Sequence, residues 1–301
     1  MIEEEKEAVV DVNSYLIAPT DVVLVDCIGQ GSTAVVYRGQ LRGAEEIAVK
    51  EIRGTQEDTI TAFQRELGIL IKVKHPHIVA FLGLIAESYP LRLCLEYCRG
   101  GSLFDLLHNH IETKLSWRQR LVILYDTATA VAHLHSYRPA IVHRDLKSLN
   151  VLLLDLVSTV DDPPHVKLAD FGFAKETEVY MTKGAGTIHW MAPEVVNGTT
   201  YTEMADTFSY AMIAYEVVCR HIPFIREKPK NVPGLISSGT RPAWDLQDQE
   251  LPSGLLDLIE RCWDQDVLKR PTFVQIWQSL AEVSENTPAH VKLSAPEPAC
   301  S

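Results

Sequence analysis

The chain has 301 residues, 46% of them hydrophobic, and a formal net charge of −12. This length is sufficient to bury a large core, in one two-lobed domain or in two small ones. The acidic balance argues against nonspecific binding to nucleic acid or to anionic membranes, and we expect neither as a partner. The six cysteines show no CxxC pair and no regular spacing, and the start Met-Ile-Glu-Glu-Glu-Lys is unlike a signal peptide. Reduced thiols in a cytoplasmic protein are therefore expected.

Roughly the first 100 residues predict a small antiparallel sheet with one helix. Residues 1–20 are acidic and then mixed, which indicates an N-terminal extension. Apolar and β-branched composition predicts strands at 22–25, 35–37, 47–52, 78–86 and 91–97. Apolar residues from Ile60 to Ile71 repeat at helical spacing, and His75-Pro76 ends that helix. The turns between strands leave no room for crossovers, so the sheet is expected to be antiparallel.

After Gly100-Gly101 the pattern becomes helical. Apolar positions from Trp117 to Leu134 predict a helix with Ser116 as its N-cap. A polar loop at 158–165 is expected to join two short strands. Further helices are predicted at 208–219, 255–263 and 273–283. The first of these is apolar nearly all round but too short to span a bilayer, and the last begins with a capping box at Thr272. Residues 284–301 are polar and rich in Pro and Ala, which predicts a disordered tail.

The segment His143-Arg-Asp-Leu-Lys-Ser-Leu-Asn150, followed by Asp170-Phe-Gly172, carries the strongest chemical signal. Asp145 could orient the proton of a hydroxyl nucleophile, and Lys147 could neutralise charge on a moving phosphoryl group. Asn150 and Asp170 offer the oxygen ligands that Mg²⁺ prefers. Residues of these types also cap turns, and any one of them alone could do only that.

A second signal is Gly29-x-Gly31-x-x-Ala34 between two predicted strands, followed by Ala48-Val-Lys50. Glycines let a backbone approach phosphates closely and point its amides at them. A dinucleotide-binding fingerprint would need a helix after the glycines, whereas a strand is predicted there. Taken alone, the glycine segment could equally be an ordinary hairpin, and Lys50 a surface lysine.

In this order the motifs resemble a protein kinase domain, whose pattern is H-R-D-L-x-x-x-N followed by D-F-G. The resemblance covers residues 21–283, and Trp190-Met-Ala-Pro-Glu194 is most similar to the tyrosine-kinase-like group, which includes Raf-like and mixed-lineage kinases. It implies an α+β, bilobal fold. A small antiparallel β-sheet lobe with one main helix would occupy 21–96, a hinge 96–100, and a larger, mainly α-helical lobe 101–283.

The resemblance also assigns roles to residues. The catalytic residues would be Asp145, Lys147, Lys50 and its helix partner Glu66. ATP would be bound by Gly29, Gly31, Val36, Ala48, Lys50, Glu96, Cys98 and Leu152, and Mg²⁺, with Mn²⁺ as an alternative, by Asn150 and Asp170. Asp206 and the pair Glu194–Arg270 would brace the scaffold. Ala34 departs from the family's third glycine, which makes the loop stiffer, but nucleotide binding is expected to survive.

The implied reaction is transfer of the γ-phosphoryl group of MgATP to Ser or Thr of protein substrates, in intracellular signalling. Lys147 and the segment Gly186–Glu194 are similar to those of Ser/Thr-specific members. Arg144 and Lys175 could clamp a phosphate on Thr182, or alternatively on Tyr180 or Thr177. An activating kinase, or self-association of the chain, would lead to this phosphorylation. Thr187 would shape the acceptor site. A loop that needs no modification is the competing interpretation.

Three other functions stay open. A dual-specificity or tyrosine kinase would differ only in its acceptor. A pseudokinase acting as an allosteric scaffold is weakened by the presence of Lys50, Glu66, Asp145, Asn150 and Asp170. A kinase for small metabolites is weakened by segments that look directed at proteins.

Overall fold

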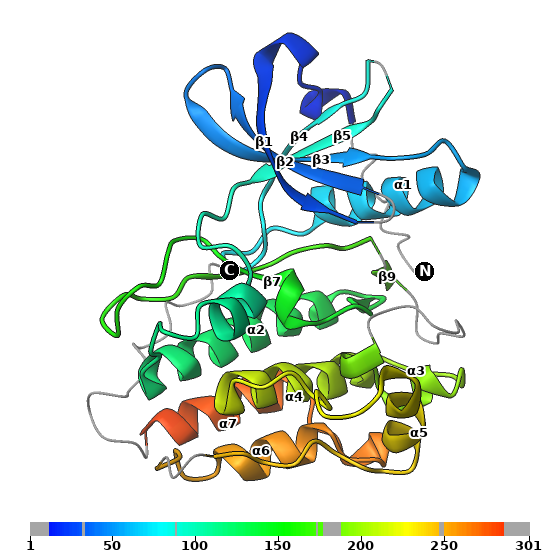
Figure 1. The fold of residues 1–301 in the computed structure, drawn as a ribbon. Coiled ribbons are helices and arrows are strands. Elements are labelled where there is room, and N and C mark those ends of the chain that lie inside the picture. Colours follow the sequence, from blue (N-terminus) through cyan, green and yellow to red (C-terminus); the bar gives the residue numbers. More distant parts are fainter. Residues whose placement is uncertain are drawn as a thin grey trace, which may run out of the picture. The chain divides into compact units, whose positions relative to one another are not determined.

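The computed structural model describes residues 12–31, 34–87, 89–172, 174–176, 188–246 and 250–285 (Figure 1). The chain divides into two compact units. The first comprises Met1–Leu67 and Ala80–Tyr97, and the second Gly68–Val79 and Cys98–Ser301. Among the described residues, no helix combines the length and the hydrophobicity needed to cross a membrane.

The described part of the first unit is built on an antiparallel sheet with the strand order β1-β2-β3-β5-β4. Its strands are β1 (Val22–Gln30), β2 (Ala34–Leu41), β3 (Glu45–Ile52), β4 (Phe81–Ile85) and β5 (Arg92–Glu96). Helix α1 (Glu57–Lys72) follows β3, and its last turn belongs to the second unit. The predicted antiparallel sheet with one helix is confirmed. Alternation along β3 buries Ile47 and Val49 and leaves Lys50 partly exposed.

The sheet core also takes in a residue from the segment that precedes β1. Ile17 is buried, and its backbone N–H donates to the carbonyl of Leu84 in β4 at 2.9 Å. It belongs to a cluster with Ile47, Val49, Ile85 and Cys94. Gly83 makes room for this segment, because a Cβ there would lie 2.7 Å from the carbonyl oxygen of Tyr15. Ile17, which precedes the domain start predicted at residue 21, thus packs into the sheet core.

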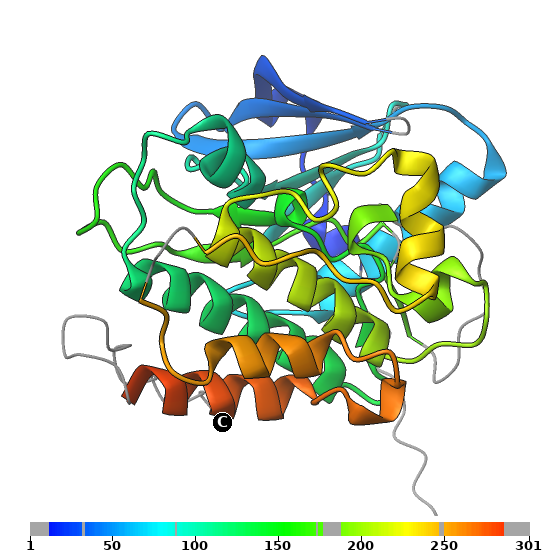
Figure 2. The same ribbon diagram turned by 60° about the horizontal axis from the view of Figure 1, so that its bottom comes forward.

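The second unit is mainly helical (Figures 1 and 2). Its helices are α2 (Trp117–Ser136), α3 (Pro193–Val196), α4 (Met204–Cys219), α5 (Val232–Ser237), α6 (Leu255–Cys262) and α7 (Phe273–Glu285). Helix α4 lies between α2 and α6 and is buried on nearly every side, as its apolar sequence predicts. The predicted N-cap Ser116 and the predicted capping box at Thr272 are present, and each side chain accepts from the backbone N–H three residues on.

Short elements complete this unit. The strand pairs are β6 (Ile141–Val142) with β9 (Lys175–Glu176), and β7 (Val151–Leu153) with β8 (Val166–Leu168). The second pair flanks the polar loop at 158–165, as predicted. The 3₁₀ helices in the described residues of both units are η1 (Val12–Tyr15), η2 (Pro19–Asp21), η4 (Ser148–Asn150), η5 (Ile188–Trp190), η6 (Pro229–Asn231) and η7 (Val267–Lys269), and η3 (Asp105–Asn109) is a π-helix.

Candidate active site

In the first unit, Lys50 and Glu66 form an ion pair between β3 and α1. The Lys50 Nζ donates to both carboxylate oxygens of Glu66, at 2.7 and 2.8 Å. The lysine side chain is 15% exposed and the glutamate side chain 4%. Because the pair is largely removed from water, it holds the ammonium group in a defined position. The partner predicted for Lys50 from its helix position is thus the residue that it contacts.

The glycine segment joins β1 to β2 and precedes Lys50 and Glu66 in the sequence. The Gly31 N–H donates to the Ala34 carbonyl at 2.9 Å. A Cβ at Gly29 would lie 3.7 Å from Val36 Cβ, and one at Gly31 would lie 3.7 Å from the Ala34 carbonyl oxygen. Both are ordinary van der Waals distances, so packing within the described residues does not require glycine at either position. Glycines there suit a segment that a ligand approaches closely.

Two of the residues predicted to cover the adenine base, Val36 and Ala48, lie on one face of the sheet. Val36 is paired with Lys50 across β2 and β3, and Ala48 lies two residues before Lys50. Paired residues, and residues two apart on a strand, point to the same face. The structure thus groups Val36 and Ala48 with Lys50 in the first unit.

The predicted hinge is divided between the units. The Glu96 N–H donates to the Ala80 carbonyl at 2.9 Å in the first unit. Cys98 is the first residue of the longer segment of the second unit, and its carbonyl accepts from the Gly101 N–H at 3.3 Å. Leu152 lies in β7, opposite Lys167, and forms a bridge with Ser102. Their contacts with a nucleotide remain predictions.

The loop from β6 to η4 brings two predicted catalytic residues, Asp145 and Lys147, into contact with each other and with the predicted metal ligand Asn150. The Lys147 Nζ donates to Asp145 Oδ2 at 2.6 Å. The Asn150 side-chain N–H₂ donates to the Asp145 carbonyl at 2.8 Å and to Oδ2 at 3.2 Å. Asp145 is 5% exposed. A carboxylate held in this way beside an ammonium group can orient a hydroxyl while the lysine attracts an anionic group.

Asp170 follows β8 and is tied to the same loop through its neighbour. The Ala169 N–H donates to the Asn150 carbonyl at 2.9 Å, and the Ala169 carbonyl contacts His143 Nε2 at 3.0 Å. Asp170 itself has a φ of +64°, which is uncommon for a residue other than glycine. One carboxylate and one amide oxygen, with substrate phosphates completing the shell, is a donor set that Mg²⁺ accepts. The residues therefore fit the ion that the resemblance implies.

Asp206, at the start of α4, fixes the backbone ahead of Asp145. Its Oδ2 accepts from the His143 N–H at 2.8 Å, and its Oδ1 accepts from the Arg144 N–H at 3.0 Å. Oδ2 also contacts His135 Nε2 at 3.0 Å. Burial alone would raise the pKa of Asp206, but His135 and the backbone donor lower it. An ionised carboxylate thus holds the loop in place.

Arg144 is engaged by an aromatic residue of the same unit. It has a φ of +70°, and its Nε donates to the Tyr201 hydroxyl at 2.8 Å. If Arg144 binds a phosphate as predicted, it does so with a guanidinium that already donates to Tyr201. Thr177, Tyr180, Thr182 and Thr187 lie outside the described residues, and Lys175 is described only in its backbone, so this phosphate binding remains a prediction.

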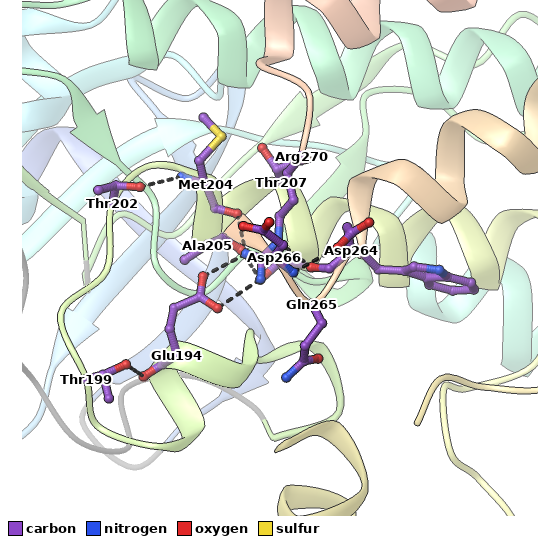
Figure 3. Close-up of polar contacts among 12 residues, drawn as sticks. Glu194, Thr199, Thr202, Met204, Ala205, Thr207, Asp264, Gln265, Asp266 and Arg270 are labelled. Carbon is purple, nitrogen blue, oxygen red and sulfur yellow. Dashed lines mark hydrogen bonds and ion pairs between the residues drawn. The ribbon is translucent and has the colours of Figure 1, made fainter. Parts of the chain in front are cut away.

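Glu194 and Arg270 form a bidentate ion pair (Figure 3). The Nη1 and Nη2 of Arg270 donate to Oε1 and Oε2 of Glu194 at 2.7 and 2.9 Å. Arg270 also donates to the carbonyls of Met204 and Asp264, at 3.0 and 2.9 Å. The arginine side chain is fully buried. This pair joins α3 to the start of α4 and to the chain that precedes α7.

Glu216 is a polar residue near the catalytic loop whose contact with it the sequence did not predict. It lies in the apolar helix α4 and is fully buried. Its carboxylate lies within hydrogen-bonding distance of Ser148 of the catalytic loop, and of His108 and Trp190. The only signal in the sequence was one acidic residue inside an apolar run. No motif indicates which residues contact it.

Comparison with known proteins agrees with this geometry. A family model described as protein kinase domain matches residues 22–280. The serine/threonine-protein kinase VIK of Arabidopsis thaliana is 36% identical over 274 residues, covering 87% of this chain and 60% of that protein. The probable serine/threonine-protein kinase drkD of Dictyostelium discoideum is 36% identical over 255 residues, covering 83% and 19%.

A third relative carries a different description. The dual specificity protein kinase shkD of Dictyostelium discoideum is 36% identical over 275 residues, covering 89% of this chain and 35% of that protein. The chain therefore spans 60% or less of the length of each of these curated relatives.

Proposed function

Since this chain belongs to the protein kinase domain family, we propose that it is an active kinase transferring the γ-phosphoryl group of MgATP to Ser and Thr of protein substrates. The observation that carries the proposal is the contact of the buried Asp145 with both Lys147 and Asn150 of the same loop. The relatives named as serine/threonine-protein kinases support the acceptor class. The finer statements on substrate, metal and regulation belong to the same proposal.

Each charged residue then has a distinct task. Asp145 orients the acceptor hydroxyl and receives its proton, while Lys147 stabilises the negative charge on the moving phosphoryl group. Asn150 and Asp170 would hold Mg²⁺, which when bound neutralises charge on the β and γ phosphates; Mn²⁺ is the alternative ion. Lys50, fixed by Glu66, would bind the α and β phosphates. The transition state is loose, so positioning and electrostatics supply most of the catalysis.

The nucleotide base would be held by backbone and apolar groups. Glu96 and Cys98 supply backbone donors and acceptors, and Val36, Ala48 and Leu152 cover the faces of the base. Gly29 and Gly31 leave space for the phosphates, as the room around each of them allows. These roles follow from the family resemblance and from the grouping of Val36 and Ala48 with Lys50.

Dual specificity is the second candidate, because one relative of similar identity is named as a dual specificity kinase. The catalytic loop does not separate the two, since Asp145 can orient a phenol as well as an aliphatic hydroxyl. The acceptor residue must therefore be identified from the phosphorylated products.

The test is a peptide array with Ser, Thr and Tyr acceptors, incubated with MgATP and either the wild-type chain or Asp145→Asn. We expect wild type to label Ser and Thr peptides, and the substitution to lower kcat by at least about 10³-fold, as for other catalytic groups. Strong Tyr labelling would support dual specificity. Equal background from both proteins would reject the kinase and favour a scaffold.

The cellular setting is part of the same proposal. The free cysteines and acidic surface are compatible with a cytoplasmic protein. Phosphorylation at Thr182 by an activating kinase, or by a second copy of the chain, would bring a phosphate toward Arg144. Phosphopeptide mapping of active protein would count against this regulation if it found the segment around Thr182 unmodified.

A further inference from the structure

Helix α4 carries a second buried carboxylate, ten residues after Asp206. Glu216 Oε1 accepts from the Ser148 hydroxyl at 2.7 Å and lies 2.9 Å from His108 Nε2. Oε2 accepts from the Trp190 indole N–H at 2.6 Å. Three segments far apart in the sequence thus meet at one side chain that has no contact with water.

The chemistry of the donors fixes how this carboxylate is used. An indole N–H can only donate, so Oε2 must accept. Burial raises the pKa of Glu216, while the donors His108, Ser148 and Trp190 offset part of that rise. Hydrogen bonds to an ionised acceptor are shorter and stronger than neutral ones. Loss of one donor would leave a buried acceptor unsatisfied, which costs folding free energy. The contacts of Glu216 therefore stabilise one another.

The position of Ser148 connects this network to the reaction. It directly follows Lys147 and begins η4, which ends at Asn150. Asp206 fixes the backbone of His143 and Arg144 before the catalytic aspartate, and Glu216 holds the chain after it. The two carboxylates are about 15 Å apart along the helix axis, so α4 supports both ends of the loop from one rigid element.

We propose that Glu216 is a positioning residue for phosphoryl transfer, which acts through Ser148 on Lys147 and Asn150. It does not touch the reacting groups. Its hydrogen bond with Trp190 also fixes η5, which precedes the segment Ala192-Pro193-Glu194. The inference rests on the proposed function. The competing interpretation is that the network stabilises the fold and leaves the reaction untouched.

Two single substitutions and their combination separate these interpretations. Ser148→Ala removes the link to the loop but leaves Glu216 with His108 and Trp190. Glu216→Gln keeps the shape of the side chain and removes its charge. Tyr210→Phe is the matched control, because Tyr210 is buried on the same helix and its hydroxyl donates to the Leu124 carbonyl at 2.9 Å, away from the loop. Thermal unfolding first establishes a temperature at which all variants are folded.

At that temperature we expect Ser148→Ala and Glu216→Gln each to lower kcat about tenfold, with the KM for peptide within about twofold of wild type. The double variant should be no slower than the slower single variant, since both remove the same connection. Tyr210→Phe should lose stability while keeping kcat. Folded variants with kcat within about twofold of wild type, or single losses that multiply in the double variant, would overturn the proposal.

A binding measurement distinguishes failure of this inference from failure of the proposed function. Calorimetric titration with ADP, in Mg²⁺ and in EDTA, should show about fivefold weaker binding for both variants only when Mg²⁺ is present, because Asn150 is displaced. If wild type transferred no phosphate but this difference appeared, the kinase assignment would fail, while the positioning of Asn150 by Glu216 through Ser148 would stand. If wild type were active and the variants bound and reacted as it does, the positioning role would fail.

Discussion

The two units hold their charged residues in different ways. In the first unit, Lys50 extends from a strand and is held by one ion pair with Glu66 on the adjacent helix. In the second unit, Asp145 lies in a loop with little regular structure, and buried carboxylates of α4 fix that loop before and after it. A strand in a sheet already defines where a side chain points, whereas a loop has to be fixed by separate contacts.

The difference has an energetic consequence. Asp206 and Glu216 are both buried, and a buried charge is tolerated only with donors in place. The second unit therefore depends on satisfied polar networks, and the first depends mainly on apolar packing around Ile17, Ile47 and Val49. Substitutions that remove one partner should reveal this contrast.

The largest effect is expected at Arg270. Arg270→Leu leaves Glu194 buried without its partner, and we expect a loss of about 3–5 kcal/mol in the free energy of unfolding. Arg261→Gln is the control, because its pair with Asp257 is exposed and should contribute about 0.3–0.5 kcal/mol. Urea denaturation measures both. Similar losses for the two variants would contradict the dependence of the second unit on buried polar pairs.

The second largest effect concerns the ion pair of the first unit. Lys50→Met should lower kcat/KM by about 10²–10³-fold, because in the proposed function this charge binds the nucleotide phosphates. Glu66→Gln should cost about tenfold, because Lys50 keeps its charge and loses only its orientation. Steady-state kinetics at saturating Mg²⁺ would test both.

A neighbouring ion pair provides the control for Lys50. Arg92 contacts Glu51 at 2.8 Å across β5 and β3, and Glu51 points to the opposite face from Lys50. Arg92→Gln should leave kcat/KM unchanged. An equal loss from Arg92→Gln would show that general disturbance of the sheet explains the effect.

A third prediction tests the apolar side of the comparison. Ile17→Ala should destabilise the first unit by about 2–4 kcal/mol, since it empties a buried position in the sheet core. The adjacent Leu16 is 47% exposed, so Leu16→Ala should cost much less. Hydrogen exchange resolved by residue would show faster exchange in β4 and β3. Unchanged exchange in these strands would show that Ile17 does not stabilise the sheet core.

The smallest effect is a change in pH dependence. Burial, with the nearby His133, His77 and Lys167, lowers the pKa of His75 to about 4 from 6.5. The stability from neutral His75 is thus full above pH 6.5 and is lost as the pH falls toward 4. His75→Phe should make the fall in melting temperature over this range less steep. The exposed His110, replaced by Gln, serves as the control; an unchanged slope for His75→Phe would contradict the prediction.

The sequence predicted those parts of the molecule that have periodic apolar spacing or that carry a known motif. Helix α2 followed from apolar spacing and its N-cap, and helix α7 from apolar spacing and its capping box. The contact between Lys50 and Glu66 followed from motif order. The π-helix at Asp105–Asn109 and the short α5 were not predicted, because one or two turns give no periodicity. These elements depend on tertiary contacts.

The site shows the same division. Asp145, Lys147 and Asn150 could be named because they stand close together in the chain. The contact of Arg144 with Tyr201, and that of Glu216 with Ser148, join residues more than 50 positions apart. A sequence shows a charge inside an apolar helix, but it does not show which donors make that burial tolerable. Such partners become visible only in three dimensions.

The most direct test of the central claim is lysine labelling by an acyl-phosphate derivative of ATP, read by mass spectrometry. The account predicts labelling of Lys50 and Lys147, protection of both by MgATP at the same half-saturating concentration, and loss of that protection in Asp170→Asn. Labelling of only one of the two, or protection at clearly different ATP concentrations, would contradict the proposal that both lysines bind one Mg²⁺-bound nucleotide.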